Sequence, residues 1–439
     1  MSKIYKPQPI SGFPEWSPEL RALELSWLDH IRRVFESYGF CNIETPAVEV
    51  LDVLLAKGEV ENEIYTLHRL QADEKDKTDA RLALRFDNTV PFARYTAQHF
   101  NNLTFPFKRY QMQKVWRGER PQEGRYREFY QCDIDVINPD NLPLHFDAEI
   151  PAVIDEIMQA LQLPAYTIYI NNRKILIGYI QALGLEAQAS AILRIVDKRD
   201  KIGEDGVIRE LTQNLKLDDA LAQKTLGLAK IRGNDANVIK QAKALGISNP
   251  MFDEGLEELA YVLNSLQGFV GNRVMADLSI VRGLDYYTGT VYETKFNDYP
   301  EIGTIIAGGR YEDLASSYIN KKLPGIGISI GLTRLLGVLI GRDMVKPLRN
   351  SPTDVLITQM DETQRNDALS LAKILRARGF NVEVYHNATK IQKQLAYADK
   401  KQIPYVWFLS NSDQPQHQVK DMAAGTQSDA DPQNWSPAK

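Results

Sequence analysis

The stretch FPFKRYQMQKVWRGERPQEGRYREFYQCDIDVI (Phe105–Ile137) decides the fold class of the first part of the chain. Its two ends, FPFKRYQMQKVWRGE and REFYQCDIDVI, are rich in aromatic and β-branched residues, which favour strands. The segment PQEGRY between them is polar and contains Pro and Gly, two residues typical of turns. The stretch therefore predicts a long antiparallel hairpin.

Helix and strand patterns surround this hairpin. Apolar residues with helical spacing run from Ser17 to Gly39, with a residue typical of a helix N-cap at the start and a glycine at the end. A strand is expected over Phe40–Thr45, and it should stop at Pro46, because proline cannot donate to a strand ladder. A further helix is expected over Phe146–Leu161.

Strand patterns return far along the chain, after a region of helical character over residues 165–270. They occupy RVMADLSIVRGLDYYTGTVYETKF (Arg273–Phe296), GTIIAGGRY (Gly303–Tyr311) and PGIGISIG (Pro324–Gly331), and the last leads into a helical pattern. Strands on both sides of a helical region predict one antiparallel sheet that a helical insertion interrupts in sequence.

From residue 353 onward, strand and helix patterns alternate, which is typical of a separate α/β domain with a parallel or mixed sheet. We therefore divide the chain into a first part of the sheet (1–164), an insertion (165–270), a second part of the sheet (271–345) and the α/β domain (353–439). The polar tail that begins at Ala423 is expected to be partly ordered.

The composition excludes several classes of protein. The 439 residues are 44% hydrophobic and 25% charged, which is ordinary for a soluble globular protein. No apolar run is long enough to span a membrane, and the N-terminus lacks the apolar segment of a secretory signal, so we expect a cytoplasmic protein without a membrane partner. The net charge of -5 does not by itself indicate a nucleic-acid partner.

The cysteines and histidines do not indicate a metal site. Cys41 and Cys132 cannot form a disulfide framework, and both are expected to be buried. The six histidines are scattered without the spacing of metal ligands, so no structural metal ion is expected.

Four arginines lie where predicted strands end or turn. They are Arg117, Arg125, Arg282 and Arg334. A guanidinium group suits a polyphosphate, because its planar fork stays charged and can bind two oxygens at once. An arginine of this kind taken alone is more often an ordinary surface or ion-pair residue.

Three glycine-rich segments lie near these arginines. RGLDYYTGTVYE (Arg282–Glu293) and AGGRYEDL (Ala307–Leu314) combine glycines with tyrosines, and they could form either ligand-binding loops or tight turns. GIGISIG (Gly325–Gly331) has the spacing GxGxxxG and lacks a surrounding βαβ unit, so it is not a dinucleotide fingerprint. A Walker A sequence is absent, so any use of ATP would require another fold.

These segments together resemble the motifs of class II aminoacyl-tRNA synthetases. FCNIETPAVE (Phe40–Glu49) resembles motif 1, VWRGERPQEGRYREFYQCDID (Val115–Asp135) resembles motif 2, and GIGISIGLTRLLG (Gly325–Gly337) resembles motif 3. RGLDYYTGTVYE and AGGRYEDL resemble the two motifs specific to histidyl-tRNA synthetases. The resemblance extends from Gly12 to about Gln427.

The resemblance implies a fold and a reaction. The expected fold is α+β, with the antiparallel catalytic sheet of class II synthetases flanked by helices, a helical insertion and a C-terminal α/β anticodon-binding domain. The expected enzyme activates L-histidine with ATP to form histidyl-adenylate, releases pyrophosphate, and transfers histidine to the 3′ end of tRNA(His). The family also implies a homodimer, built partly through motif 1.

For ATP, the resemblance implies that Arg117 and Arg282 are catalytic and hold the α-phosphate. Arg125 and Arg334 would hold the β- and γ-phosphates, with Mg²⁺ bridging these phosphates, and Phe129 would stack on adenine. Alignment and charge neutralisation are the main demands of such a reaction.

For histidine, the resemblance implies that Asp87, Thr89 and Gln131 receive the α-ammonium group. A neutral imidazole has one donor and one acceptor nitrogen, so a selective pocket needs a carboxylate and a hydroxyl. The matching positions are Asp135 and Tyr287, with Tyr311 lining the pocket. Without the resemblance, Asp135 would be taken for a strand residue that faces solvent.

For tRNA, the resemblance places Gln122 of the motif 2 turn near the acceptor end, and it assigns the anticodon to residues 353–439. Basic and acidic residues balance in this domain. Lys373, Arg376 and Arg378 are candidates for RNA contacts, and a solvated helix face explains them equally well.

Two departures and two alternatives accompany the resemblance. Asp87 and Asn88 stand where many bacterial relatives carry a longer carboxylate and a glycine, and the usual closing helix of the C-terminal domain is missing. One alternative is a noncatalytic regulatory paralogue of ATP phosphoribosyltransferase in histidine biosynthesis, which would lack the anticodon module. The other is a synthetase-like RNA sensor, which would lose the ATP-binding arginines or gain a signalling domain.

Overall fold

The computed structural model describes residues 6–55, 63–70, 81–281, 287–316, 318–410 and 416–437, without the side chain of residue 200. Contacts divide the chain into two compact units. The first consists of Met1–Pro14 and Trp27–Met344, and the second of Glu15–Ser26 and Val345–Lys439. Helix α1 (Pro18–Ser37) contributes residues to both units.

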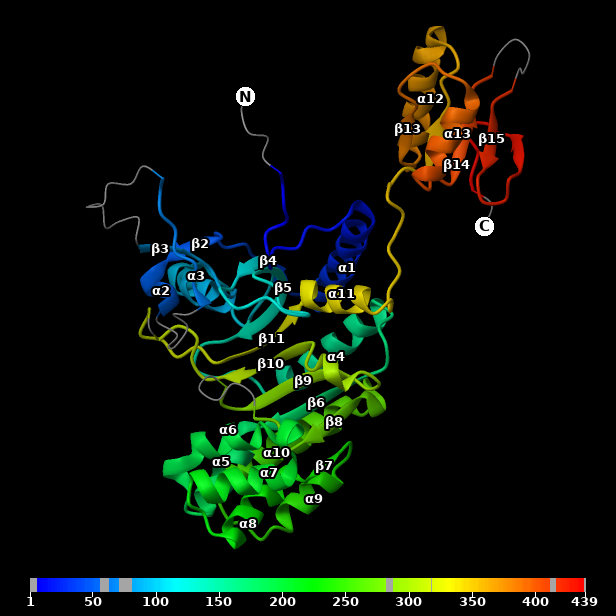
Figure 1. The fold of residues 1–439 in the computed structure, drawn as a ribbon. Helices are drawn as coiled ribbons and strands as arrows, with labels where there is room; N and C mark the ends of the chain where they lie inside the picture. The colour runs from blue at the N-terminus through cyan, green and yellow to red at the C-terminus, as the bar shows by residue number, and fades with distance from the viewer. Residues whose placement is uncertain are drawn as a thin grey trace. The chain divides into compact units, whose positions relative to one another are not determined.

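A large sheet forms the centre of the first unit (Figure 1). Its strands in the described part of the chain are β1 (Cys41–Asn42), β4 (Phe107–Trp116), β5 (Glu128–Ile137), β6 (Tyr166–Asn172), β7 (Arg232–Gly233), β8 (Val274–Asp277), β9 (Thr290–Phe296), β10 (Ile306–Tyr311) and β11 (Gly325–Gly331). Their order in the sheet is β1-β4-β5-β11-β10-β9-β6-β8-β7. The pairings are antiparallel except for β1 with β4 and β6 with β8.

The strand pairing confirms the predicted hairpin and the predicted interruption of the sheet. β4 and β5 pair from Phe107 opposite Ile137 to Trp116 opposite Glu128. β11, which lies almost two hundred residues further along the chain, pairs with the other edge of β5. The sheet that carries the candidate motifs is therefore continuous in space although the helices between them interrupt it in sequence.

Some helices of the first unit cover this sheet, and others form a group beyond one end of it. They are α2 (Leu51–Leu55), α3 (Thr89–His99), α4 (His145–Ala160), α5 (Arg173–Ala182), α6 (Ala189–Val196), α7 (Arg199–Asn214), α8 (Asp219–Ala229), α9 (Asn237–Lys243), α10 (Pro250–Leu266) and α11 (Leu332–Gly341). Figure 1 shows α5 to α10 gathered beyond β6 and β8. The range 165–270 begins with β6 and so contains a strand of the sheet as well as these helices. None of the helices that the structure describes is long and apolar enough to cross a membrane.

A buried ion pair joins α4 to β10. Asp147 is completely buried, and its two carboxylate oxygens each lie 3.1 Å from Nε of Arg310. Burial raises the pKa of Asp147, while the hydrogen bonds and charge of Arg310 act to lower it. The same guanidinium group donates to the carbonyl of Leu142 at 3.1 Å. This pair fixes the strand that carries Tyr311 against the helix behind it.

The region of motif 1 differs from the prediction in two respects. The strand expected over Phe40–Thr45 is only two residues long, because the chain leaves β4 after Ile43 donates to the carbonyl of Tyr110. The carbonyl of Thr45 is bound instead by Arg85, at 2.6 Å. Cys41 is exposed, so its predicted burial was wrong, whereas Cys132 is buried as predicted.

The second unit is a mixed α/β sheet, as the sequence predicts. Its elements are β12 (Val355–Ile357), β13 (Val382–Val384), β14 (Tyr405–Phe408), β15 (Gln418–Asp421), β16 (Gln427–Asp429), α12 (Arg365–Ala377) and α13 (Ile391–Lys400). β12 runs parallel to β13 and β14, and β15 and β16 continue the sheet antiparallel. Leu371 of α12 packs with Ile357, and Ala398 of α13 packs with Leu356, so the two helices cover opposite faces.

The tail of the second unit is tied to its core. The ring of Trp435 lies 5.2 Å from the rings of Phe380 and Tyr405 and 5.4 Å from that of Trp407. Arg378 donates to the carbonyl of Pro432 at 2.6 Å. This arginine, a candidate for an RNA contact in the sequence, therefore stabilises the tail.

Candidate active site

The pocket face of the sheet is set by the alternation of β5. Side chains two residues apart on a strand point to the same face, which brings Gln131, Asp133 and Asp135 together. On the neighbouring strand β11 their partners are Gly331, Ser329 and Gly327. Small residues thus face three polar side chains, which leaves room above the sheet.

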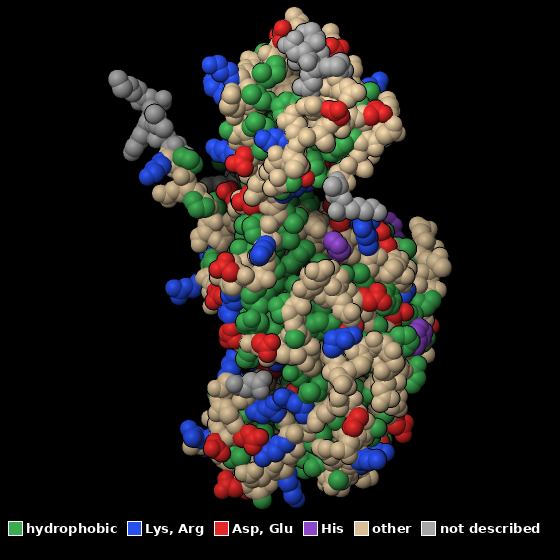
Figure 2. All heavy atoms as spheres, turned by 90° about the vertical axis from the view of Figure 1, so that its right-hand side faces the viewer, with side chains coloured by type: hydrophobic (Ala, Val, Ile, Leu, Met, Phe, Trp, Pro, Cys, Tyr) green, Lys and Arg blue, Asp and Glu red, His purple; other side chains and the backbone are tan. Residues whose placement is uncertain are grey.

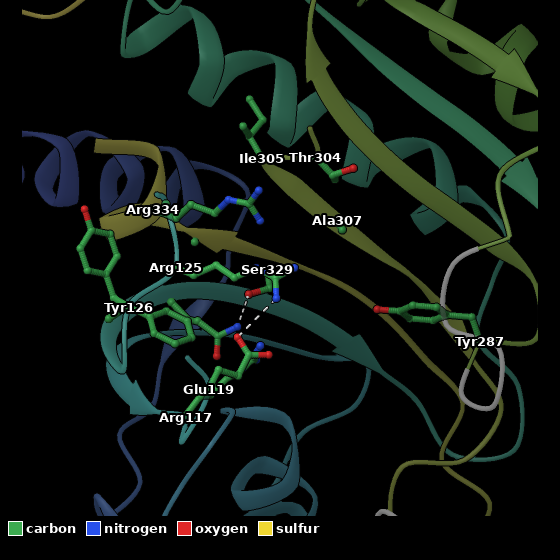
Figure 3. A pocket seen from close by; sticks show the side chains of 14 residues that line it. Arg117, Glu119, Arg125, Tyr126, Tyr287, Thr304, Ile305, Ala307, Ser329 and Arg334 are labelled. Atoms are coloured by element: carbon green, nitrogen blue, oxygen red, sulfur yellow. Dashed lines mark hydrogen bonds and ion pairs between the residues drawn. The ribbon is translucent and has the colours of Figure 1, made fainter. Parts of the chain in front are cut away.

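A cavity of about 360 Å³ opens at this face. It is lined by Arg117, Glu119, Gly124, Arg125, Tyr126, Phe129, Gln131, Tyr287, Thr304, Ile305, Ala307, Ser329, Gly331 and Arg334. Figure 3 shows Arg117, Arg125 and Arg334 toward one end of this cavity and the hydroxyl of Tyr287 pointing in from the other. Six residues proposed from the sequence are therefore brought together: Arg117, Arg125, Phe129, Gln131, Tyr287 and Arg334.

Arg117 is held in a defined orientation at the end of β4. Its Nε donates to the carbonyl of Phe86 at 3.1 Å, and its guanidinium carbon lies 5.2 Å from the ring centre of Phe129. The charge also lies 4.0 Å from the carboxylate of Glu63. The Arg117 side chain remains 29% exposed, so a bound anion could reach it.

Arg125 and Arg334 reach the same cavity from the motif 2 turn and from α11. Arg125 is 53% exposed, and Nη1 lies 3.8 Å from a carboxylate oxygen of Glu119. Arg334 donates from Nη2 to the carbonyl of Ile302 at 3.0 Å. Arg282, the fourth arginine of the sequence analysis, lies outside the described residues.

A second, smaller cavity of about 40 Å³ adjoins the first. It is lined by Thr89, Asp133, Asp135, Tyr287, Tyr311, Gly327, Ile328 and Ser329, so Tyr287 and Ser329 belong to both cavities. Tyr311 is buried and donates to Oδ1 of Asp135 at 2.9 Å. Asp135 faces this cavity and is 5% exposed, which overturns the alternative that it points to solvent.

The glycines of GIGISIG have a steric role at this cavity. A side chain on Gly327 would overlap the carboxylate of Asp135, and one on Gly325 would overlap the ring of Tyr311. Both glycines are buried on β11. They make room for these two polar side chains and do not form a phosphate loop.

Arg109 is a buried residue of the site that sequence reasoning missed. It lies directly opposite Asp135 in the β4–β5 register and forms an ion pair with it. The side chain of Arg109 is completely buried, with its guanidinium carbon 4.2 Å from the ring centre of Phe92. The charge of Asp135 is therefore balanced by a residue that lines neither cavity.

The start of α3 supplies the other wall of the small cavity. Asp87 accepts a hydrogen bond from the backbone N–H of Val90 at 3.0 Å, and the side chain of Asn88 donates to Oδ2 of Asp133 at 2.9 Å. Burial raises the pKa of Asp133, while Arg109, Ser329 and Asn88 act to lower it. Thr89 lines the small cavity, whereas Asp87 lines neither cavity.

Gln122 lies apart from both cavities, in the exposed turn between β4 and β5. Its backbone N–H donates to the carbonyl of Arg125 at 3.3 Å, and the N–H of Arg125 donates back at 2.8 Å. Gly124 in this turn has a φ of 68°, a conformation that favours glycine. The turn thus holds Gln122 outward from the sheet.

Sequence reasoning also missed Glu119, Tyr126, Asp133 and Ser329, which line the cavities. The alternation of QCDID carried a usable signal for Asp133, because Asp133 shares a strand face with Gln131 and Asp135. Arg109 gave no such signal, since only the register of β4 against β5 places it beside Asp135. In the described part of the chain, no group of three or more His, Cys, Asp or Glu side chains could hold a metal ion.

The antiparallel sheet, the cavity ringed by arginines and the strand-to-helix passage from β11 into α11 define a class II aminoacyl-tRNA synthetase. Family models agree: residues 12–335 match the histidyl-tRNA synthetase model, and residues 354–434 match an anticodon-binding domain. The chain belongs to the histidyl-tRNA synthetase family.

Similar proteins support this membership over the full length. The chain is 57% identical over 434 residues to a histidine–tRNA ligase of Thermobifida fusca, covering 99% of each chain. It is 45% identical over 440 residues to one of Micrococcus luteus, covering 98% of this chain and 96% of the relative. A crystal structure of histidyl-tRNA synthetase from Nostoc superposes with a TM-score of 0.89 at 40% identity, covering 98% of this chain and 97% of the other.

A structure described as an ATP phosphoribosyltransferase regulatory subunit or histidyl-tRNA synthetase, from Bacillus halodurans, also resembles the chain. It has a TM-score of 0.77 but only 21% identity, so it shows the fold alone. The regulatory alternative is therefore not favoured.

Proposed function

We propose that the two adjoining cavities are where this histidine–tRNA ligase joins histidine to ATP and then to tRNA. In the first step a carboxylate oxygen of histidine attacks the α-phosphorus of ATP, and pyrophosphate leaves. In the second step a ribose hydroxyl at the 3′ end of tRNA attacks the carbonyl carbon of histidyl-adenylate, and AMP leaves. The observation that carries this proposal is the contact between a cavity ringed by arginines and a small carboxylate-lined cavity.

The large cavity would hold ATP. Arg117 and Arg282 would bind the α-phosphate, and Arg125 and Arg334 would bind the β- and γ-phosphates. Guanidinium groups placed where charge develops lower the barrier to such an attack. The ring of Phe129, which Arg117 contacts, would stack on adenine.

Mg²⁺ would enter the site together with ATP. Glu119 is the acidic side chain that lines the large cavity, and its carboxylate could add one oxygen ligand. A single carboxylate suits Mg²⁺ bound mainly by phosphates and water. The ion would supply positive charge that stabilises the leaving pyrophosphate.

The small cavity would select histidine. Asp135 and Tyr287 would pair with the two imidazole nitrogens, with Tyr311 holding the carboxylate in place. Thr89, Gln131 and Asp87 would receive the α-ammonium group. An amino acid without an imidazole would leave these buried polar groups unpaired, which penalises its binding.

The tRNA would contact both units. Gln122 in the exposed motif 2 turn would lie near the acceptor end, and the domain of residues 353–439 would read the anticodon. Lys, Arg, Asp and Glu side chains are interspersed over the face shown in Figure 2, so RNA would be held by local contacts.

Dimerisation, compartment and domain limits complete the proposal. We propose a cytoplasmic homodimer that uses the region of motif 1. Val50 and Leu82 are opposite one another on the small sheet of β2 (Val48–Val50) and β3 (Leu82–Leu84), and they are 39% and 38% exposed. The catalytic domain would comprise 1–164 and 271–345, around an insertion at 165–270.

Charging of tRNA tests the proposed site. The wild-type protein, supplied with ATP, Mg²⁺ and labelled histidine, should charge tRNA(His). Arg117→Ala should lower the rate of adenylate formation by about 100-fold or more, as loss of one transition-state donor does. Arg209→Ala, an exposed arginine of α7, should leave it unchanged. Equal rates for the two variants would remove Arg117 from the site.

A further inference from the structure

Two buried side chains hold carbonyl groups of another segment where β6 passes into α5. Asn171 donates from its side-chain amide to the carbonyl of Ile280 at 2.8 Å, and Nη1 of Arg173 donates to the carbonyl of Val281 at 2.8 Å. All four residues are at most 6% exposed. The two carbonyls lie beyond the last residue of β8, so these side chains take the role that ladder donors have within a strand.

Arg173 also bonds to the chain on the other side of residues 282–286. Its backbone N–H donates to the carbonyl of Gly289 at 2.8 Å. One residue further back, the N–H of Thr288 donates to the carbonyl of Arg310 at 2.9 Å. Arg173 therefore joins two points of the chain, Val281 and Gly289, that lie on either side of Tyr287 in the sequence.

The ring of Tyr287 is packed in place beside these bonds. A Cβ atom on Gly309 would lie 3.0 Å from Cδ1 of Tyr287, so the ring lies over this glycine. Tyr287 lines both cavities, and Figure 3 shows its hydroxyl pointing into the larger one. A shift of the chain at Gly289 would therefore move the hydroxyl that is proposed to meet an imidazole nitrogen.

The place of Arg173 is unfavourable for a cation on local grounds. It is the first residue of α5, where the helix dipole disfavours positive charge, and it is buried. The bond to the carbonyl of Val281 offsets part of this cost, because hydrogen bonds from a charged donor are strong. The charge thus strengthens the attachment of Val281.

Helix α5 is itself fixed by α10. Nζ of Lys174 lies 2.7 Å from a carboxylate oxygen of Glu254 and 2.6 Å from one of Glu258. The side chain of Asn172 donates to Glu258 at 2.7 Å. These contacts hold the first turn of α5 against its neighbour in the helical insertion. Arg173 therefore donates from a firmly held position.

We propose that Arg173 is a positioning residue of the amino-acid site, which holds Val281 and Gly289 so that Tyr287 keeps its place at both cavities. This inference rests on the proposed function, which gives Tyr287 a contact with the imidazole. Arg173 itself lines neither cavity. Its effect on histidine binding therefore passes through Tyr287.

A double-mutant cycle tests this role. The dissociation constant of L-histidine is measured by calorimetry on the full chain without ATP. Arg173→Met and Tyr287→Phe should each weaken binding by about tenfold, as the loss of one hydrogen-bond partner does. The variant with both changes should bind no more than about threefold more weakly than Tyr287→Phe alone, whereas independent effects would multiply to about 100-fold. Arg173→Lys keeps a charged donor for the carbonyl of Val281 and should bind within about threefold of the wild type.

A control variant and a wild-type measurement separate this role from general stability. Arg199→Met removes another guanidinium donor to a backbone carbonyl, that of Ala229 in the helical insertion, and should leave the dissociation constant unchanged. Hydrogen exchange of the wild type needs no variant, so it gives a test even if Arg173→Met does not fold. Histidine should slow exchange in peptides that contain Arg173, whose N–H donates to Gly289, and not in those of α9.

The outcomes separate the two levels of the proposal. A wild-type protein that neither binds histidine nor catalyses histidine-dependent ATP–pyrophosphate exchange would contradict the proposed function itself. In an active wild type, effects of Arg173→Met and Tyr287→Phe that multiply would overturn only the role of Arg173. Unchanged binding in Arg173→Met, an equal loss in Arg199→Met, or no slowing of exchange around Arg173 would do the same.

Discussion

Tyr311 donates a hydrogen bond of 2.9 Å to Oδ1 of Asp135. Strand β11 lies between these two residues, and both of their register partners on it are glycines. Gly327 faces Asp135 and Gly325 faces Tyr311, and neither position has room for a Cβ atom. The position of the carboxylate proposed to hold the imidazole therefore depends on the absence of side chains at these two glycines of β11.

The steric argument predicts the effect of Gly327→Ala. The added methyl group would overlap the Asp135 carboxylate and the carbonyl of Ile134, so the strand pair or the carboxylate must shift. We expect histidine-dependent exchange to fall by about 100-fold or more, because a misplaced group of this kind is that costly. Gly341→Ala, at the open end of α11 with nothing within 4 Å, should retain exchange. Normal exchange in Gly327→Ala would refute the packing described for the small cavity.

Replacing Arg109 by Met should expose the cost of an uncompensated carboxylate. Asp135 would remain buried without its ionic partner, and such a loss costs about 3–5 kcal/mol of folding free energy. The midpoint of urea unfolding should fall, and the KM for histidine should rise while that for ATP stays constant. An unchanged midpoint would show that Arg109 does not compensate Asp135.

A second buried pair gives a stability test away from the cavities. Asp147→Asn would leave Arg310 buried without its counter-ion and should lower the free energy of unfolding of the first unit by about 3 kcal/mol. The matched control is Glu312→Gln, which breaks an ion pair with Lys322 whose side chains are 55% and 44% exposed. This control should cost less than about 1 kcal/mol. An equal loss of unfolding free energy in the two variants would contradict the greater stabilisation assigned to the buried pair.

Trp435 should stabilise the second unit. Trp435→Ala removes the ring that packs on Phe380, Tyr405 and Trp407, and a loss of about 3 kcal/mol is expected for such a truncation. Thermal unfolding should show an earlier transition for this unit, with ATP–pyrophosphate exchange preserved and tRNA charging impaired. A variant that charges tRNA normally at the temperature of that transition would contradict this role.

The sequence predicted the elements more completely than the arrangement of the site. The β4–β5 hairpin and the alternation of the second unit follow from local patterns, because pleating and turn chemistry are local properties. Six residues that line the large cavity were found through the motifs that contain them, whereas Glu119, Tyr126 and Ser329 of the same lining were missed. Arg109 was not found, because its role depends on a register that no local pattern fixes.

The errors near motif 1 have a similar origin. A strand that continues over Phe40–Thr45 until Pro46 was predicted, but Arg85 binds the carbonyl of Thr45 and the chain turns away from β4. The exposure of Cys41 follows from its place on the short edge strand β1. A buried arginine from another segment therefore overrode the local propensity of this stretch.

The central claim is that the paired cavities activate histidine and no other amino acid. ATP–pyrophosphate exchange by the purified protein, measured with each of the twenty amino acids in turn, tests it most directly. The account predicts exchange that depends on histidine alone. Failure of histidine to stimulate exchange, or equal stimulation by an amino acid without an imidazole, would contradict it.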